Sequence, residues 1–404
     1  MLRRLAPLLI YLFPALMDAA LGAVILVTPI RLAREGFAPV LVTGVVAAWG
    51  VVYMLTSFLV GWVVSPRNCV GLMIGGATST AGACYLFTHT GSVVSIYLAM
   101  ALFGFTFAFC MTPFQVFMKS IGQGQSKSPA WAAGLYTCAW SVGMAAGRLG
   151  AGQIFDWSWR ACYLLAMVPL LLGPMCIVAL RRLSRSDEDR NPRRKSSNPS
   201  TQPTPDKTPP IDYTGQPDLA WLGWVGSGSA TLVLALTISL FPDFAVKKLD
   251  LSAAVQGNVQ SLIAASRAAV ALTMLGSRWW MYRWFHVATL GLVGVVGAGL
   301  FGMGETAWGF YLAATVYGAY SGGFFFYLVF HALTHPSRTG VYVGVNEVVV
   351  GGANVAGPLL GGVLAGAVGY RGTYFTAAVF LAVVVSVQAA VHRRNPARVE
   401  DAWA

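Results

Sequence analysis

Twelve long apolar runs constrain this chain more than any other feature of its sequence. Each run is close to the roughly 20 residues that an α-helix needs to cross the hydrocarbon core of a bilayer. The bilayer offers no water to the backbone, so such runs must form helices whose peptide groups bond internally. We therefore predict an all-α membrane protein with twelve transmembrane helices. The runs cover residues 5–29, 40–64, 69–88, 93–117, 130–154, 160–180, 219–241, 251–275, 284–304, 308–333, 341–367 and 373–392.

Composition excludes the soluble classes of protein. Of the 404 residues, 56% are hydrophobic and 10% are charged, whereas about 25% are charged in a typical soluble domain. The net charge of +12 would suit a nucleic-acid-binding protein if the basic residues clustered on one soluble face. Here they lie between apolar runs and in one linker. We therefore expect membrane lipid around the chain and no nucleic-acid partner.

No sequence pattern indicates an enzyme, a metal site or a resident cofactor. The six cysteines all lie in apolar runs and form no C-x-x-C pair, which favours packing over a metal or disulfide framework. His331 and His335 are spaced as H-x-x-x-H, without the glutamate of the zinc-protease motif. No G-x-x-x-x-G-K-S/T loop is present, so ATP-driven pumping by this chain is not expected.

One polar segment divides the chain into two halves. Residues 181–218 hold seven prolines, eight basic residues and almost no large apolar side chain, so they cannot bury a core. We predict an N-terminal six-helix bundle over 1–180, a disordered basic linker over 181–218, and a C-terminal six-helix bundle with a short tail over 219–404. One interpretation of the linker is that it only joins the halves. The other is that its cations also bind anionic lipid headgroups.

The two halves repeat one design near their ends. In each half, a glycine-rich helix is followed by a short loop with the pattern R-x-x-Y and then by another span. Such an echo indicates a parallel internal repeat. The matching pairs are Gly147 with Gly357 and Gly152 with Gly362, at a shift of 210, and Arg160 with Arg371 and Tyr163 with Tyr374, at a shift of 211.

The distribution of basic residues orients the chain. With both termini on one side, that side holds 19 of the 27 basic residues, counting the linker, and the opposite loops hold six. Loops rich in lysine and arginine stay in the cytoplasm. We therefore expect a multi-pass protein of the plasma membrane, or inner membrane of a bacterium, with both termini and the central linker cytoplasmic.

Over essentially its whole length, the chain resembles the major facilitator superfamily of secondary transporters. The six-plus-six pattern, the basic linker and the glycine-rich fifth and eleventh helices carry the resemblance. Residues 357–362 read G-P-L-L-G-G, similar to the G-P-x-x-G-G pattern of the family's proton-coupled exporters, while 147–152 carry arginine in place of proline. Between helices two and three, residues 61–70 lack the aspartate of the family's G-x-x-x-D-R-x-G-R-R pattern.

The resemblance implies two six-helix bundles that rock around a mid-membrane site, in a protein that acts as a monomer. In the family, helices 1, 2, 4, 5, 7, 8, 10 and 11 line the cavity. Four charged residues fall inside such helices in this chain: Asp18, Arg148, Arg267 and Glu347. A charge at mid-bilayer costs about 2.5–3.5 kcal/mol even on lenient scales, so each needs a reason.

Depth along the helices suggests two pairs, Asp18 with Arg148 and Arg267 with Glu347. One interpretation is that these are ion pairs that fasten helices. The other is that an arginine binds an anionic substrate group, since guanidinium matches carboxylate or phosphate, while an acid takes up a proton. Other polar side chains expected at cavity depth are Tyr53, Gln115, Tyr136, Asn258, Tyr317, Tyr320 and Asn346.

The sequence thus predicts a secondary active transporter of a small solute. It works by alternating access between the halves, coupled to protons, and its substrate is an organic anion. The alternative is a non-transporting membrane sensor or assembly partner derived from the same fold, which the altered segment between helices two and three supports.

The predicted orientation can be tested by labelling introduced cysteines in intact cells with a membrane-impermeant maleimide. Positions in 242–250 should react from outside, and positions in the linker, 185–215, should be protected. Labelling of the linker from outside would overturn the orientation.

Overall fold

The computed structural model describes residues 10–122, 129–190, 218–275, 277, 279–334 and 339–394. Within those ranges the ordered elements are α-helices, and no residue is in a strand. The helices are α2 (Leu12–Arg34), α3 (Pro39–Val63), α4 (Cys69–Phe87), α5 (Val93–Gly122), α6 (Pro129–Phe155), α7 (Trp159–Arg190), α9 (Ala220–Leu249), α10 (Ala253–Leu275), α11 (Trp284–Met303), α12 (Ala307–Thr334) and α13 (Thr339–Arg394).

Helix α13 consists of two spans joined at a sharp bend. It holds 56 residues, which would extend about 84 Å at 1.5 Å per residue, far more than a bilayer. Gly369 interrupts it with φ 75° and ψ 170°, a conformation open to glycine and not to residues with a Cβ. The eleven helices of the described ranges therefore fit the predicted twelve spans, and the all-α membrane fold is confirmed.

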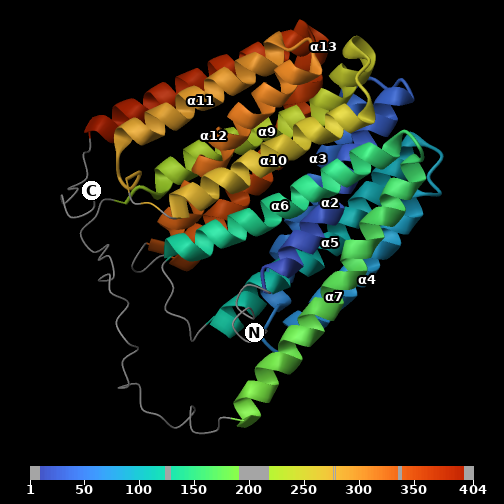
Figure 1. Ribbon diagram of the computed structural model, residues 1–404, viewed down its shortest axis with the longest axis vertical. Coiled ribbons are helices and arrows are strands. Elements are labelled where there is room, and N and C mark those ends of the chain that lie inside the picture. The colour runs from blue at the N-terminus through green and yellow to red at the C-terminus, as the bar shows by residue number, and fades with distance from the viewer. Residues whose placement is uncertain are drawn as a thin grey trace.

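Nine of the described helices are long and apolar enough to cross a membrane by length and composition. Helices α6 and α10 are not among the nine. They pack against each other where the two halves meet, as Figure 1 shows. Their lower apolar content fits a position in the protein interior, since a helix that does not face lipid can carry polar side chains.

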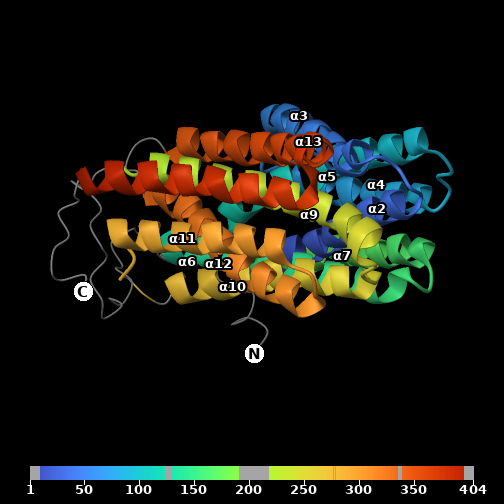
Figure 2. The same cartoon turned by 90° about the horizontal axis from the view of Figure 1, so that it is seen from above.

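The first helix of each half lies at the centre of the molecule. In each helix we compare the buried share of its most apolar stretch. That share is 83% in α2 and 89% in α9, whereas it is 33–50% in α3, α4, α5, α7 and α11. The first half, blue to green, and the second half, yellow to red, lie beside each other, and their helices run roughly parallel to one another in the second view (Figures 1 and 2).

The predicted internal repeat is visible as a repeated helix contact. A Cβ on Gly147 of α6 would lie 1.8 Å from the carbonyl oxygen of Ala19 on α2, and a Cβ on Gly357 of α13 would lie 2.3 Å from that of Leu232 on α9. Small residues let helices in lipid approach at backbone distance. Each half therefore uses the same glycine to seat its fifth helix against its first.

Two helices continue beyond the predicted span ends. Helix α7 runs to Arg190, ten residues into the predicted linker. Residues 191–217, the remainder of that linker, lie outside the described residues. Helix α9 continues to Leu249, so residues 242–245, expected in an exposed loop, are helical and buried. In this segment the labelling test applies to the exposed Lys248 and Asp250.

The halves are closed against each other at one end of the molecule. We call this the distal end; it holds residues 35–38, between α2 and α3, and 250–252, between α9 and α10. Lys247 Nζ donates to the carbonyl oxygen of Phe37 across the halves and forms an ion pair of 2.6 Å with Asp243. Gln153 Nε2 donates to Asn258 Oδ1 at 3.2 Å.

At the other end, the terminal end, where α2 begins and α13 ends, α3 and α13 lie farther apart. Going along α13 toward the terminal end, Gly351 is the last glycine that approaches α3 closely. A Cβ on Gly351 would lie 3.1 Å from the side chain of Met54. Beyond it, Gly344 has no neighbour within 4 Å of a built Cβ, and Phe58 is 61% exposed. Helices α7 and α11 diverge toward this end in Figure 1. The distal side is therefore the tighter closure.

Replacing Lys247 with methionine should loosen the distal closure, because it removes the cation that joins Asp243 to the α2–α3 loop. A reporter cysteine at Ala253, fully buried beside Gly152, should then react with a maleimide several-fold faster in the purified protein. Lys248→Met is the matched control, since Lys248 is exposed. Equal labelling rates in both variants and the parent would show that Lys247 does not hold the distal end closed.

Candidate functional site

A close contact between α2 and α6 brings two of the predicted charges together. A Cβ on Gly143 would lie 2.0 Å from the carbonyl oxygen of Ala15, and Gly147 makes the equivalent approach to Ala19. Asp18 lies on α2 between those two alanines, and Arg148 follows Gly147 on α6. The glycine spacing G-x-x-x-G thus sets a backbone-to-backbone contact between the two helix segments that carry Asp18 and Arg148.

Arg267 of α10 completes a cluster with these two residues. The carboxylate of Asp18 interacts electrostatically with both Arg148 and Arg267, and the two arginines interact with each other. The exposed fractions of Asp18, Arg148 and Arg267 are 5%, 3% and 6%. We call these three residues the charge cluster. It draws Asp18 and Arg148 from the first half and Arg267 from the second, so it lies between the two halves.

The hydrogen-bonding capacity of the charge cluster is only partly used. Arg148 Nη1 donates to the carbonyl oxygen of Gln260 at 3.2 Å, and Arg267 Nη2 donates to Ser321 Oγ at 3.0 Å. Among the described residues, Asp18 Oδ2, Arg148 Nε and Arg267 Nε have no hydrogen-bond partner. Leaving a buried polar atom unbonded costs about 1–3 kcal/mol, and more for a charged group. The cluster can therefore bind a further polar group.

The predicted pairing of Arg267 with Glu347 stays a prediction, and the described contacts of Arg267 are to Ser321 and Trp140. The carboxylate that interacts with Arg267 is that of Asp18. Glu347 lies on α13, is exposed, and interacts electrostatically with Tyr53 of α3. Helix α10 faces α6, whereas α13 faces α3 and α9. Asp18 and Arg148, the other predicted pair, interact electrostatically, and their pairing stays a prediction.

The other predicted polar residues are distributed over several places. Tyr53 stacks on Trp49, with ring centroids 5.2 Å apart, and Tyr136 is half-buried on α6. Asn258 lies at the distal contact between the halves. The side chain of Gln115 is outside the described residues. Three residues bond within the second half: Tyr317 OH to Ala230 O at 2.7 Å, Tyr320 OH with Ser229 Oγ at 3.3 Å, and Asn346 Oδ1 with Trp224 Nε1 at 2.8 Å.

Trp140 and Ser321 contact the charge cluster and were not predicted from the sequence. The guanidinium carbon of Arg267 lies 4.6 Å from the ring centroid of Trp140 on α6, a cation–π contact between the halves. Ser321 accepts the hydrogen bond from Arg267. No sequence signal separates this tryptophan from the aromatic residues that only pack.

Asp243 is a further buried charge, at a position where the sequence predicts a loop. It is fully buried near the end of α9, where Lys247 forms its ion pair and Tyr370 OH donates to its Oδ2 at 2.7 Å. The spacing of four residues to Lys247 on a helix was the available signal. Because its partners Lys247 and Tyr370 lie outside the charge cluster, we assign Asp243 to the distal closure.

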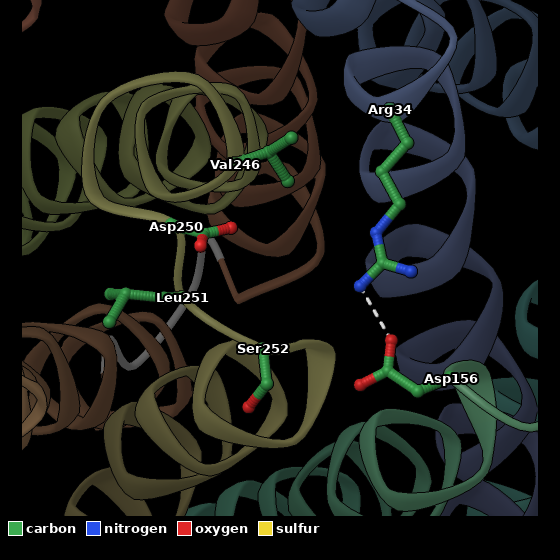
Figure 3. Close-up of a pocket in the computed structure, with 6 residues that line it drawn as sticks. All are labelled: Arg34, Asp156, Val246, Asp250, Leu251 and Ser252. Carbon is green, nitrogen blue, oxygen red and sulfur yellow. Dashed lines mark hydrogen bonds and ion pairs between the residues drawn. The ribbon is translucent and has the colours of Figure 1, made fainter.

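A pocket of about 370 Å³ opens at the distal end between the halves. Figure 3 shows the ion pair of Arg34 with Asp156, 2.5 Å long, on one side and Asp250, Leu251 and Ser252 on the other. None of the charge-cluster residues lines it. Its arginine is already paired with its aspartate, so the charge cluster remains the candidate site.

Comparison with known proteins identifies the family to which the fold belongs. A family model described as Major Facilitator Superfamily matches residues 130–335, which are 206 of the 404 residues. No curated protein sequence matches the chain.

Solved structures of three transporters are similar to the chain over nearly its whole length. A bacterial homologue of the human lysosomal transporter Spinster, in an inward-facing and occupied conformation, superposes with a TM-score of 0.67 at 14% identity, covering 97% of each chain. The nucleoside transporter NupG gives 0.66 at 12% identity, covering 95% of this chain and 98% of its own. The human organic anion transporter MFSD10 (TETRAN) gives 0.62 at 13% identity, covering 95% and 99%. At such identities the similarity concerns the fold.

Proposed function

The chain belongs to the major facilitator superfamily, and from that premise we propose that it is a secondary active transporter that moves a small organic anion together with a proton. One observation carries the proposal. Two buried guanidinium groups, one from each half, interact electrostatically with a single buried carboxylate. A site contributed by both halves changes when they rock, which is what alternating access requires.

The charge of the cluster favours an anion. With Asp18 ionised, two arginines and one aspartate leave a formal charge of +1 in the membrane interior. Burying an uncompensated charge costs several kcal/mol, so a carboxylate or phosphate group that enters the site neutralises it. The unbonded Nε atoms of Arg148 and Arg267 offer donors to such a group, and planar guanidinium binds two oxygens in parallel.

The same cluster can couple the anion to a proton. An anion that binds Arg148 and Arg267 competes with Asp18 for their positive charge. Once its partners are taken, the buried carboxylate is stabilised by protonation, because burial favours the neutral acid. One anion and one proton would then cross together without a second coupling site.

The alternative function, a sensor or assembly partner that does not transport, rests on the segment between α3 and α4. Here Asn68 closes a local turn: its Oδ1 accepts from the Ser65 backbone N–H at 2.7 Å, and its Nδ2 donates to Val63 O at 2.8 Å. This polar side chain is used within its own loop. Movement of any solute in proteoliposomes would exclude the alternative.

Replacing Arg267 separates anion binding from a structural role. We expect Arg267→Gln to weaken binding of the anion selected by a thermal-shift screen of metabolites by about 100-fold, since hydrogen bonds to charged groups contribute about 1.5–3 kcal/mol each. Arg267→Lys keeps the charge but loses the planar fork, so it should weaken binding less. Arg371→Gln, at an exposed ion pair with Glu305, is the control. Normal binding by both Arg267 variants would remove this arginine from the site.

Replacing Asp18 tests the coupling. Asp18→Asn cannot gain or lose the proton, so accumulation of the anion driven by a pH gradient in proteoliposomes should be lost, while exchange of anion for anion should persist. Asp250→Asn, on the exposed distal loop, is the control and should keep both activities. Full gradient-driven accumulation by Asp18→Asn would show that Asp18 is not the coupling residue.

A further inference from the structure

A row of unbonded donors continues from the charge cluster along α6. Thr137 and Ser141 are fully buried, yet their hydroxyl groups have no hydrogen-bond partner within the described part of the chain, and neither has Trp140 Nε1. Elsewhere in this protein, buried Thr28, Thr80, Thr237 and Ser239 donate to the carbonyl oxygen four residues earlier, as such residues do in membrane helices. Thr137 and Ser141 do not, and buried Thr43 and Ser227 in other helices are likewise unbonded.

The donors of the row on α6 face the second half. Residues 134, 137, 141, 148 and 152 recur at three-, four- and seven-residue steps, which places them on one side of a helix. The two ends of this row contact α10: Gly134 approaches Leu275, and Gly152 approaches Gly257. Arg148 bonds to the Gln260 carbonyl of the same helix. Thr137 and Ser141 therefore lie on the side of α6 that meets α10, the helix of Arg267.

Trp140 connects this row to Arg267. Its indole lies under the Arg267 guanidinium at 4.6 Å and against the ring of Phe325 on α12, with centroids 5.0 Å apart and planes at 67°. Phe325 is one helical turn from Ser321, the hydrogen-bond partner of Arg267. Both rings are half-buried, and the indole Nε1 is itself buried.

We propose that Trp140, Thr137 and Ser141 form a second part of the site that selects the body of the substrate, and that this body is a planar aromatic ring bearing hydrogen-bond acceptors. The inference rests on the proposed function, in which Arg267 binds the anionic group. A ring attached to that group extends over the indole, where aromatic pairs prefer offset or edge-to-face contact. Acceptors on the ring satisfy the three donors, which an alkyl body would leave unbonded.

Two probes that share charge and size but differ in planarity test the inference on the unmodified protein. Benzoate and cyclohexanecarboxylate each carry one carboxylate on a six-membered carbon ring without an acceptor, so this pair tests the aromatic ring alone. Pyridine-3-carboxylate, whose ring nitrogen accepts a hydrogen bond, tests the donors and should bind more tightly than benzoate. Burial of apolar area alone favours the saturated ring, because it exposes more aliphatic surface to water. Titration calorimetry on purified protein should instead show tighter binding of benzoate by about three- to tenfold, the range of an aromatic pair.

Variants of Trp140 assign that preference to its ring. Trp140→Leu should lower the affinity for benzoate more than the affinity for cyclohexanecarboxylate and so abolish the preference, since a leucine still offers apolar surface beside Arg267. Trp140→Phe keeps an aromatic face and should retain the preference. Trp308→Leu, at a position that is 79% exposed, is the control and should match the parent protein.

The two proposals fail in different ways. If both probes bind equally, or if Trp140→Leu keeps the preference, while Arg267→Gln abolishes binding of both, the inference about the substrate body is wrong and the proposed function stands. If neither benzoate, cyclohexanecarboxylate, acetate nor inorganic phosphate binds in a manner that depends on Arg267, the anion site itself is wrong and the inference falls with it.

Discussion

The backbone contact between α2 and α6 is the constraint on which the rest of this structure depends. Gly143 and Gly147 allow no side chain there, since a Cβ would lie 2.0 Å and 1.8 Å from the carbonyl oxygens of α2. That approach holds together the helix segments that carry Asp18 and Arg148, away from lipid, where an isolated charge would cost about 2.5–3.5 kcal/mol or more. Arg267 adds a second cation from the other half. The charge cluster thus exists only because two helices touch and two halves meet.

The internal repeat explains both the symmetry of the scaffold and the asymmetry of the site. Gly147 and Gly357 seat equivalent helices in the two halves, but the residue that follows is Arg148 in one half and Pro358 in the other. The scaffold contact is therefore duplicated, while the charge is not. An asymmetric site inside a symmetric frame is what a transporter needs to hold one substrate between two halves that move as similar bodies.

The sequence predicts the fold well because the bilayer limits the choices. Twelve apolar runs of bilayer length leave little freedom, and even the sharp bend at Gly369 falls between two predicted spans. The charge cluster is predictable in part: Asp18, Arg148 and Arg267 are conspicuous as charges in apolar runs. Their grouping is less so, because position along a helix gives height and not the direction in which a side chain points. Arg267 and Glu347 share a height, yet α10 faces α6 and α13 faces α3.

Two other features escape the sequence for separate physical reasons. Trp140 contacts Arg267, but an aromatic residue in an apolar run has the same pattern whether it packs or binds. Asp243 lies inside α9, since its ion pair with Lys247 and its bond from Tyr370 make the last turns stable in the interior. In the sequence alone, the charges of Asp243 and Lys247 indicate that the predicted span ends before them, at residue 241. The distal closure was therefore visible only in the folded chain.

The central claim is that one cluster of two arginines and one aspartate carries one anion with one proton. It is tested most directly by measuring anion flux and proton flux together in proteoliposomes that contain the unmodified protein. We expect the two fluxes to rise together, with about one proton moved for each anion, and an outward-directed anion gradient to drive protons outward. Anion movement without proton movement would contradict the coupling by Asp18. Absence of both fluxes for anions that bind would contradict transport itself.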